Sequence, residues 1–178
     1  MRSTAQPVAP PVPGPVLPDV LRENLRIVFC GSAAGRRSAA LGAYYAGPGN
    51  RFWPTLHAVG LTPRLLRPEE FALLPDFGLG LTDLCKTASG ADQALPPAAD
   101  DPAALRRKIE RYRPAVLAFV GKRPAAVTLG RRVDYGAQPE RIGAPGMTTA
   151  LFVLPSPSGL ARRYWDEEPW RALALAAG

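Results

Sequence analysis

Short apolar runs alternate with amphipathic segments along most of the chain. Four of these runs are typical of buried strands; they span residues 25–30, 78–82, 115–120 and 150–154. Apolar positions at helical spacing predict helices over 51–59, 68–74, 101–112, 124–129 and 169–176. The helix at 101–112 has a clear start, because Asp101 is a good capping residue and Pro102 suits the first helical position.

Strands that alternate with helices favour a mostly parallel sheet covered by helices on both faces, which is an α/β fold. Six prolines fall within residues 1–19, and such a composition favours extended, solvated backbone. We therefore expect residues 1–19 to form a tail and residues 20–178 to form one domain. The tail is either passive or an arm laid along the domain or along a nucleic acid.

The composition narrows the class of protein. Of the 178 residues, 47% are hydrophobic, which excludes a wholly disordered chain. No apolar run is long enough for a membrane helix, and the first residues lack the apolar stretch of a secretory signal. The net charge is +7, and 19 of the 22 basic residues are arginine, whose planar group binds phosphate oxygens in pairs. The charge favours a nucleic-acid partner, although a bias in genome base composition also produces an arginine excess.

Metal-binding residue types are scarce. The two cysteines, Cys30 and Cys85, form no CxxC pair, and His57 is the one histidine of the chain. These residues are too few for a zinc or iron–sulfur site, so we expect no metal and no cofactor. Two reduced thiols are typical of a cytoplasmic protein.

Ligands of parallel sheets bind beyond the carboxyl ends of the strands. The candidate ligand-binding loops are therefore those that follow the predicted strands, at 31–35, 82–87, 121–122 and 155–162. The first loop, Gly31-Ser32-Ala33-Ala34-Gly35, is neither a Walker A motif nor a full GxGxxG sequence, so a Rossmann-type nucleotide-binding enzyme is the weaker alternative. The segment 44–53 is dense in aromatic and turn residues. In 154–163 a rigid Pro-Ser-Pro-Ser-Gly turn precedes Leu160 and two arginines, a combination suited to wedging a base stack while phosphates are held.

Taken in order, these segments resemble the mismatch-specific uracil-DNA glycosylases, which group with the thymine-DNA glycosylases in the uracil-DNA glycosylase superfamily. The resemblance covers residues 25–165, and its most specific parts are Asn50-Arg51-Phe52-Trp53 and Pro157-Ser158-Gly159-Leu160. It implies a three-layer α/β/α sandwich, no cofactor, and hydrolysis of the N-glycosidic bond of flipped-out uracil, chiefly in G·U mismatches. The expected partner is double-stranded DNA with a mismatched or damaged base, bound by a cytoplasmic monomer associated with the nucleoid. Iron–sulfur relatives use four cysteines, so that branch is set aside.

The resemblance also implies site residues. Those of the base pocket are Gly31, Ser32, Ala33, Tyr45, Asn50 and Ser156, and those of the DNA wedge and the opposite-base contacts are Gly159, Leu160, Ala161 and Arg162. Ser158, Arg163 and Lys122 are candidates for phosphate contacts. Tyr45 aligns with the aromatic residue, usually phenylalanine, that stacks on the flipped base. Ser156 stands where the family has an asparagine.

The chain departs from the family pattern at Ala33, where the family has the asparagine that positions the attacking water. A carboxylate at the same edge of the sheet could orient water and stabilise positive charge on the sugar. Asp83, just after the strand at 78–82, is the best candidate, Asp92 is the second, and Asp76 falls at the far end of that strand. An aspartate after a strand is also a common turn former or helix cap.

Two functions remain open at this point. In one, the protein is a glycosylase with Asp83 as its catalytic residue. In the other, suggested by Ala33, it binds mismatches or lesions in DNA without catalysis. If it is an enzyme, alanine at 33 and serine at 156 leave a roomier pocket, and we expect activity beyond G·U.

Overall fold

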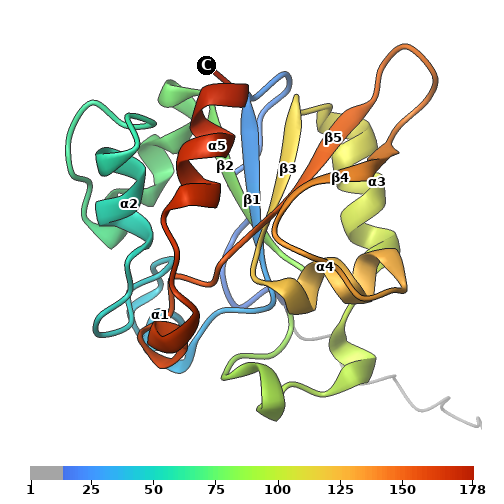
Figure 1. Cartoon of the computed structure of the whole chain (residues 1–178). Helices are drawn as coiled ribbons and strands as arrows, with labels where there is room; N and C mark the ends of the chain where they lie inside the picture. The colour runs from blue at the N-terminus through green and yellow to red at the C-terminus, as the bar shows by residue number, and fades with distance from the viewer. Residues whose placement is uncertain (1–13) are drawn as a thin grey trace, which may run out of the picture.

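Five strands form one sheet in the order β2-β1-β3-β5-β4 in the computed structural model, which describes residues 14–178 (Figure 1). They are β1 (Ile27–Gly31), β2 (Leu79–Asp83), β3 (Val116–Val120), β4 (Gly136–Ile142) and β5 (Thr149–Leu154). The first four in the sheet order run parallel, and β4 pairs antiparallel with β5 at one edge. The predicted α/β fold with a mostly parallel central sheet is confirmed.

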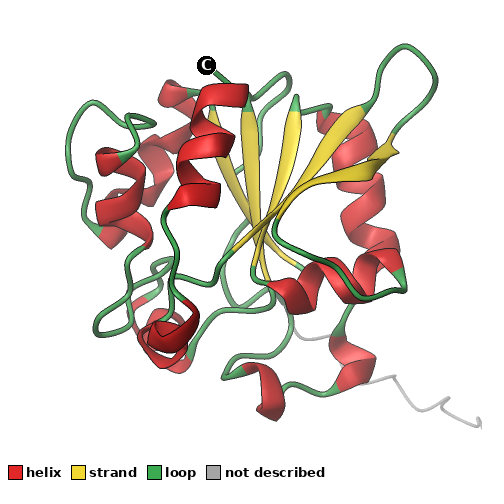
Figure 2. Ribbon diagram, viewed as in Figure 1, coloured by secondary structure: helices red, strands yellow, loops and turns green. Residues whose placement is uncertain are grey.

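Helices cover both faces of the sheet (Figure 2). On one face lie α2 (Phe52–Ala58) and α5 (Glu168–Ala176), and on the other α3 (Pro102–Tyr112) and α4 (Lys122–Leu129). Each face of the sheet has its own hydrophobic core, and successive side chains of β1 point alternately into one core and the other. Ile27 and Phe29 pack with the α2 and α5 side, whereas Val28 and Cys30 pack with the α3 and α4 side.

The four predicted strands are present within one or two residues of their expected bounds. The predicted cap of α3 is also confirmed, because the backbone N–H of Ala104 donates to Asp101 Oδ1 over 2.7 Å. The segment predicted as a helix at 68–74 is a longer 3-10 helix, η1 (Pro68–Phe77). Four short elements were not predicted, namely α1 (Arg36–Leu41), η2 (Asp92–Ala94), η3 (Pro97–Ala99) and η4 (Gly159–Tyr164).

The strand β4 was also missed, because its sequence is mostly polar. It reads Gly-Ala-Gln-Pro-Glu-Arg-Ile, and its residues alternate between half-buried and exposed up to Ile142. Its pairing with β5 shifts register between Ala137 and Arg141, around Pro139. An edge strand tolerates a proline at such an irregularity, since no second neighbour requires its N–H group.

The described part of the predicted tail packs against the sheet. Leu17 is 1% exposed and belongs to the core. The Val16 N–H donates to the Lys86 carbonyl over 2.7 Å, and Val20 forms an antiparallel bridge with Leu81. Residues 14–20, called the N-terminal strap below, are therefore part of the folded domain and not a tail. Residues 1–13, with the four prolines Pro7, Pro10, Pro11 and Pro13, lie outside the described residues.

Within residues 14–178, no helix is both long enough and apolar enough to cross a membrane. In the same range, no cluster of three or more His, Cys, Asp or Glu side chains could hold a metal ion.

Candidate active site

The carboxyl ends of β1 and β2 place Gly31 and Asp83 side by side in the sheet. Asp83 is the last residue of β2 and is only 5% exposed. A β-carbon added to Gly31 would lie 3.0 Å from Asp83 Oδ1 and 3.2 Å from the Tyr45 hydroxyl. The absence of a side chain at Gly31 therefore leaves room for a carboxylate and a phenol at the same point of the sheet edge.

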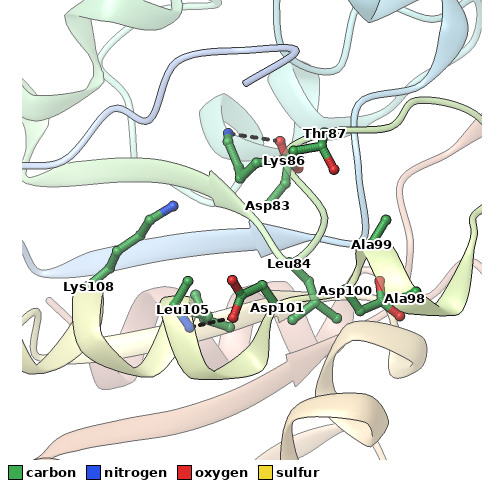
Figure 3. A pocket seen from close by; sticks show the side chains of 11 residues that line it. Asp83, Leu84, Lys86, Thr87, Ala98, Ala99, Asp100, Asp101, Leu105 and Lys108 are labelled. Carbon is green, nitrogen blue, oxygen red and sulfur yellow. Dashed lines mark hydrogen bonds and ion pairs between the residues drawn. The ribbon is translucent and has the colours of Figure 1, made fainter. Parts of the chain in front are cut away.

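The Asp83 carboxylate is buried beside the ammonium group of Lys86. Lys86 Nζ lies 3.4 Å from Asp83 Oδ2 (Figure 3). It also donates to the Tyr44 hydroxyl over 2.9 Å. Burial raises the pKa of Asp83 to about 6, and the positive charge of Lys86 offsets only part of that rise. The carboxylate is thus ionised at neutral pH, yet it is a better proton acceptor than an exposed aspartate.

Tyr45 is held in an uncommon conformation next to this carboxylate. Its φ is +53°, in the left-handed region that few residues other than glycine adopt. Its ring stacks on Phe52, with centroids 3.9 Å apart and planes at 18°. Its buried hydroxyl forms no hydrogen bond with any residue in the range 14–178. Backbone strain together with an unpaired buried hydroxyl is more typical of a ligand site than of a packing role.

Three further residues of the predicted base pocket lie in nearby loops. The Ser32 carbonyl accepts the Cys85 N–H over 2.8 Å, which joins the loops after β1 and β2. Ala33 is half-buried in the first of these loops. Asn50 Oδ1 accepts the N–H of Phe52 over 2.9 Å, so this side chain forms the turn that opens α2.

The two segments that carried most of the resemblance, 50–53 and 157–160, lie together and form one surface with Arg162 and Arg163, called the wedge surface. The Arg51 N–H donates to the Pro157 carbonyl over 2.9 Å. A β-carbon on Gly159 would lie 2.7 Å from the Pro48 carbonyl oxygen, so only glycine allows the two loops to approach this closely. The Arg162 guanidinium lies against the 47–51 loop as well. Both loops lie at the lower end of the sheet in Figure 1, where the parallel strands end.

Leu160 protrudes from this surface. It is 87% exposed at the start of η4, and its N–H donates to the Ser158 hydroxyl over 3.2 Å. Arg162 and Arg163 are exposed on the same short helix, and Ala161 is half-buried. An exposed large apolar side chain followed by two arginines matches the wedge that the resemblance implies. The Ser158 hydroxyl serves as a helix cap in this structure.

Ser156 and Lys122 lie near the end of β3. The Ser156 β-carbon is 3.8 Å from the position of a β-carbon on Gly121, the residue that precedes α4. The Lys122 ammonium group, predicted to bind phosphate, lies 3.4 Å from the Asp134 carboxylate and 4.6 Å from the Tyr135 ring centroid. Its charge is therefore directed toward the loop before β4.

A cavity of about 530 Å³ borders Asp83 on its other side, between the loop after β2 and α3 (Figure 3). Lys86 and Lys108 both line it, together with Asp100 and Asp101 near the start of α3. None of the six predicted base-pocket residues lines this cavity. This cavity is therefore distinct from the side of Asp83 that faces Gly31 and Tyr45.

Two charged residues of the site were missed in the sequence. Lys86 follows Asp83 by three residues, a spacing that could have revealed it. Asp19 lies in the proline-rich segment, and no local pattern links it to the site. Its carboxylate lies 3.0 Å from Lys86 Nζ and 2.6 Å from Lys108 Nζ, and it accepts the Thr82 hydroxyl over 2.8 Å.

A comparison with known families decides the class of protein. The family model of the uracil DNA glycosylase superfamily matches residues 18–175. The chain belongs to the uracil DNA glycosylase superfamily. Membership supports a DNA glycosylase, a hydrolase of base excision repair with DNA as its substrate. It displaces the alternative of a Rossmann-type nucleotide-binding enzyme.

A solved structure agrees with the superfamily assignment. The chain is similar to a solution NMR structure from Methanosarcina acetivorans, described as that of a candidate uracil DNA glycosylase. The two share 25% identity with a TM-score of 0.57, over 90% of this chain and 96% of the other. The likeness therefore extends over most of both chains.

Proposed function

We propose that this protein is a monofunctional, mismatch-specific uracil-DNA glycosylase that acts on G·U and on further bases. The observation that carries this proposal is the buried Asp83 carboxylate, with a pKa of about 6, at the end of β2 beside Gly31 and Tyr45. We further propose that it works as a cytoplasmic monomer on double-stranded DNA.

The wedge surface and the base pocket have separate roles in base flipping. The arginines of the wedge surface, Arg51, Arg162 and Arg163, hold phosphates, while Leu160 fills the stack that the base vacates. Gly159 and Ala161 contact the opposite guanine through their backbones. Flipping is least costly for a poorly paired base, which favours G·U over paired uracil.

The pocket then receives the flipped base. One face of the Tyr45 ring is covered by Phe52, and the base stacks on the other face. Ser156 supplies a hydroxyl that can donate or accept a hydrogen bond where the family has an asparagine. Ala33 adds no polar group, so a larger base is accommodated beside it.

Asp83 performs the chemistry that the family asparagine would otherwise support. As the bond between C1′ and the base nitrogen breaks, its electron pair leaves with the base and positive charge develops on the sugar. The Asp83 carboxylate stabilises that charge and accepts a proton from the water whose oxygen bonds to C1′. The products are the free base and an abasic site in intact DNA.

The function is tested with a duplex that carries one uracil opposite guanine. We expect alkali-dependent strand cleavage at the uracil after incubation with the protein, and no cleavage without alkali, since a monofunctional enzyme leaves the backbone intact. Binding of the same duplex without cleavage would support the non-catalytic alternative. A panel with thymine, ethenocytosine and single-stranded uracil tests the breadth of substrates, and strict confinement to G·U would contradict the roomier pocket.

Replacement of Tyr45 by phenylalanine separates the ring from the hydroxyl. We expect Tyr45→Phe to lower kcat about 3- to 10-fold with little change in KM, because stacking remains and one neutral hydrogen bond to the base or the water is lost. Tyr112→Phe, on α3 outside the site, is the matched control. An unchanged kcat in Tyr45→Phe would show that the unpaired hydroxyl has no role in the reaction.

A further inference from the structure

The N-terminal strap brings a second carboxylate to the edge of the active site. Asp19 lies within hydrogen-bond or ion-pair distance of Lys86, Lys108 and Thr82, at 3.0, 2.6 and 2.8 Å. Although burial opposes ionisation, the two lysines hold the pKa of Asp19 below its ordinary value. Asp19 is therefore a fixed negative charge.

Lys86 stands between two acids. Its ammonium nitrogen is 3.0 Å from Asp19 Oδ1 and 3.4 Å from Asp83 Oδ2, and its side chain is only 15% exposed. Because water screens these charges poorly, the strength with which Lys86 stabilises one carboxylate depends on the other. Asp19 is the nearer of the two.

The strap does not need the Asp19 side chain in order to dock. Val20 exchanges two backbone hydrogen bonds with Leu81, each 2.9 Å long, and the Val16 N–H donates to Lys86. Leu17 is buried in the core, and the Pro18 carbonyl accepts the Tyr44 hydroxyl over 3.1 Å. These contacts hold the strap, so docking alone does not explain the half-buried charge of Asp19.

We propose that Asp19 is a positioning residue for Asp83: it holds the Lys86 ammonium group between the two carboxylates and so limits how strongly Lys86 neutralises Asp83. This inference rests on the proposed function, in which Asp83 accepts a proton. In this role Asp19 controls the proton affinity of the Asp83 carboxylate without contacting the DNA. The N-terminal strap therefore contributes to the active site.

The sign of the effect follows from the charges around Asp83. Removal of the negative charge of Asp19 leaves Lys86 to act on Asp83 alone, which lowers the pKa of Asp83 from about 6. Removal of Lys108 acts in the opposite direction, because Asp19 then engages Lys86 more strongly. The ionisable groups that face Asp83 are Lys86 on its own loop, Asp19 on the strap, Lys108 on α3 through Asp19, Tyr44 and Tyr45 before α2, and Cys30 on β1. Asp100 and Asp101 line the same cavity as Asp83. Burial raises the pKa of both tyrosines and of the thiol, so these three stay neutral.

The test compares Asp19→Asn with the full-length wild type in single-turnover excision of uracil from pH 4.5 to 8.5. We expect the acid limb of the profile to move to lower pH by roughly one unit. Asp19→Glu, which retains the charge, should restore most of the wild-type profile. Asp76→Asn is the matched control, since Asp76 is exposed and lies before β2 at the opposite end of the strand.

A second variant keeps the inference testable if Asp19→Asn does not fold. Lys108→Gln removes a partly exposed side chain and should move the acid limb to higher pH. A shift to higher pH in Lys108→Gln supports the inference, and a profile that coincides with that of the wild type overturns it. Where Asp19→Asn folds, its shift should have the opposite direction.

A direct titration separates this inference from the proposed function. The pKa of Asp83 is measured by carbon-13 NMR of its carboxyl group in wild type and Asp19→Asn, with Asp83→Asn used to assign the signal. A lower value in Asp19→Asn supports the inference even if no uracil is excised, in which case the proposed function alone fails. An unchanged value overturns the role of Asp19 whatever the activity.

Discussion

Asp83→Asn is expected to lower the rate of uracil excision from a G·U duplex by about 10²- to 10⁴-fold, the usual contribution of a positioned general base. The amide has nearly the shape of the carboxylate, but it cannot accept the proton of water or offset positive charge on the sugar. Asp83→Ala should lose at least as much activity. The measurement is the single-turnover rate at pH 8, with DNA binding followed separately to show that the substrate still associates.

The pH dependence of the same reaction gives a second readout. Because burial raises the pKa of Asp83 to about 6, the wild-type rate should fall as the pH drops through 6 and the carboxylate is protonated. In Asp83→Asn this limb should disappear from the residual activity.

The thermal stability of Asp83→Asn shows whether the Asp83 carboxylate has a catalytic or a structural role. Its pKa rises from an ordinary 3.8 to about 6 on folding, so at pH 8 the buried negative charge of Asp83 costs about 3 kcal/mol. This penalty is absent below pH 3.8, grows as the pH rises from 3.8 to 6, and has its full value above pH 6. Asp83→Asn removes the charge, and Lys86 keeps Asp19 as its partner. We therefore expect the variant to melt no lower than the wild type at pH 8, as measured by thermal unfolding.

Asp92→Asn is the matched control, because Asp92 is exposed in η2 and was the second candidate in the sequence. We expect its excision rate to equal that of the wild type. Wild-type activity in Asp83→Asn, or a loss confined to Asp92→Asn, would remove Asp83 from the reaction. A large drop in melting temperature for Asp83→Asn would instead indicate a turn-forming role.

The sequence predicted those parts of the fold that depend on local apolar patterns. The strands at β1, β3 and β5 are short runs of buried residues, and they are recognisable because both faces of a parallel sheet exclude water. The edge strand β4 has water on one side and a proline within it, so it carries no such pattern. The 3-10 helices η2, η3 and η4 are too short for a periodic signal.

The same distinction applies to the site. Asp83 could be predicted because its position after a strand fixes its place at the carboxyl edge of the sheet. Asp19 could not, because its partners Lys86 and Lys108 lie far away in sequence and only tertiary packing brings the strap to them. A proline-rich composition indicates an extended backbone, but it does not show whether that backbone is solvated or packed against a sheet edge.

Leu160→Ala is expected to lower excision from double-stranded G·U DNA by about 10- to 100-fold, because the flipped state then leaves an unfilled gap in the stack, and unstacking a base step costs a few kcal/mol. The side chain is 87% exposed, so its loss should change the free energy of unfolding by less than about 0.5 kcal/mol. The measurement compares single-turnover rates on duplex and single-stranded uracil. On the single strand no stack is vacated, and the variant should equal the wild type.

The control for Leu160 is another leucine with almost the same exposure. Leu175 is 85% exposed on α5, and Leu175→Ala removes the same apolar area from a helix outside the wedge surface. Equal rates for Leu175→Ala and wild type would show that exposure of an apolar side chain is not itself what speeds excision. A loss in Leu160→Ala of the same size on both substrates would place the side chain at the pocket, whereas no loss on the duplex would contradict the wedge. A loss confined to the duplex requires Leu160 to act on the base stack, because that stack is the feature the single strand lacks.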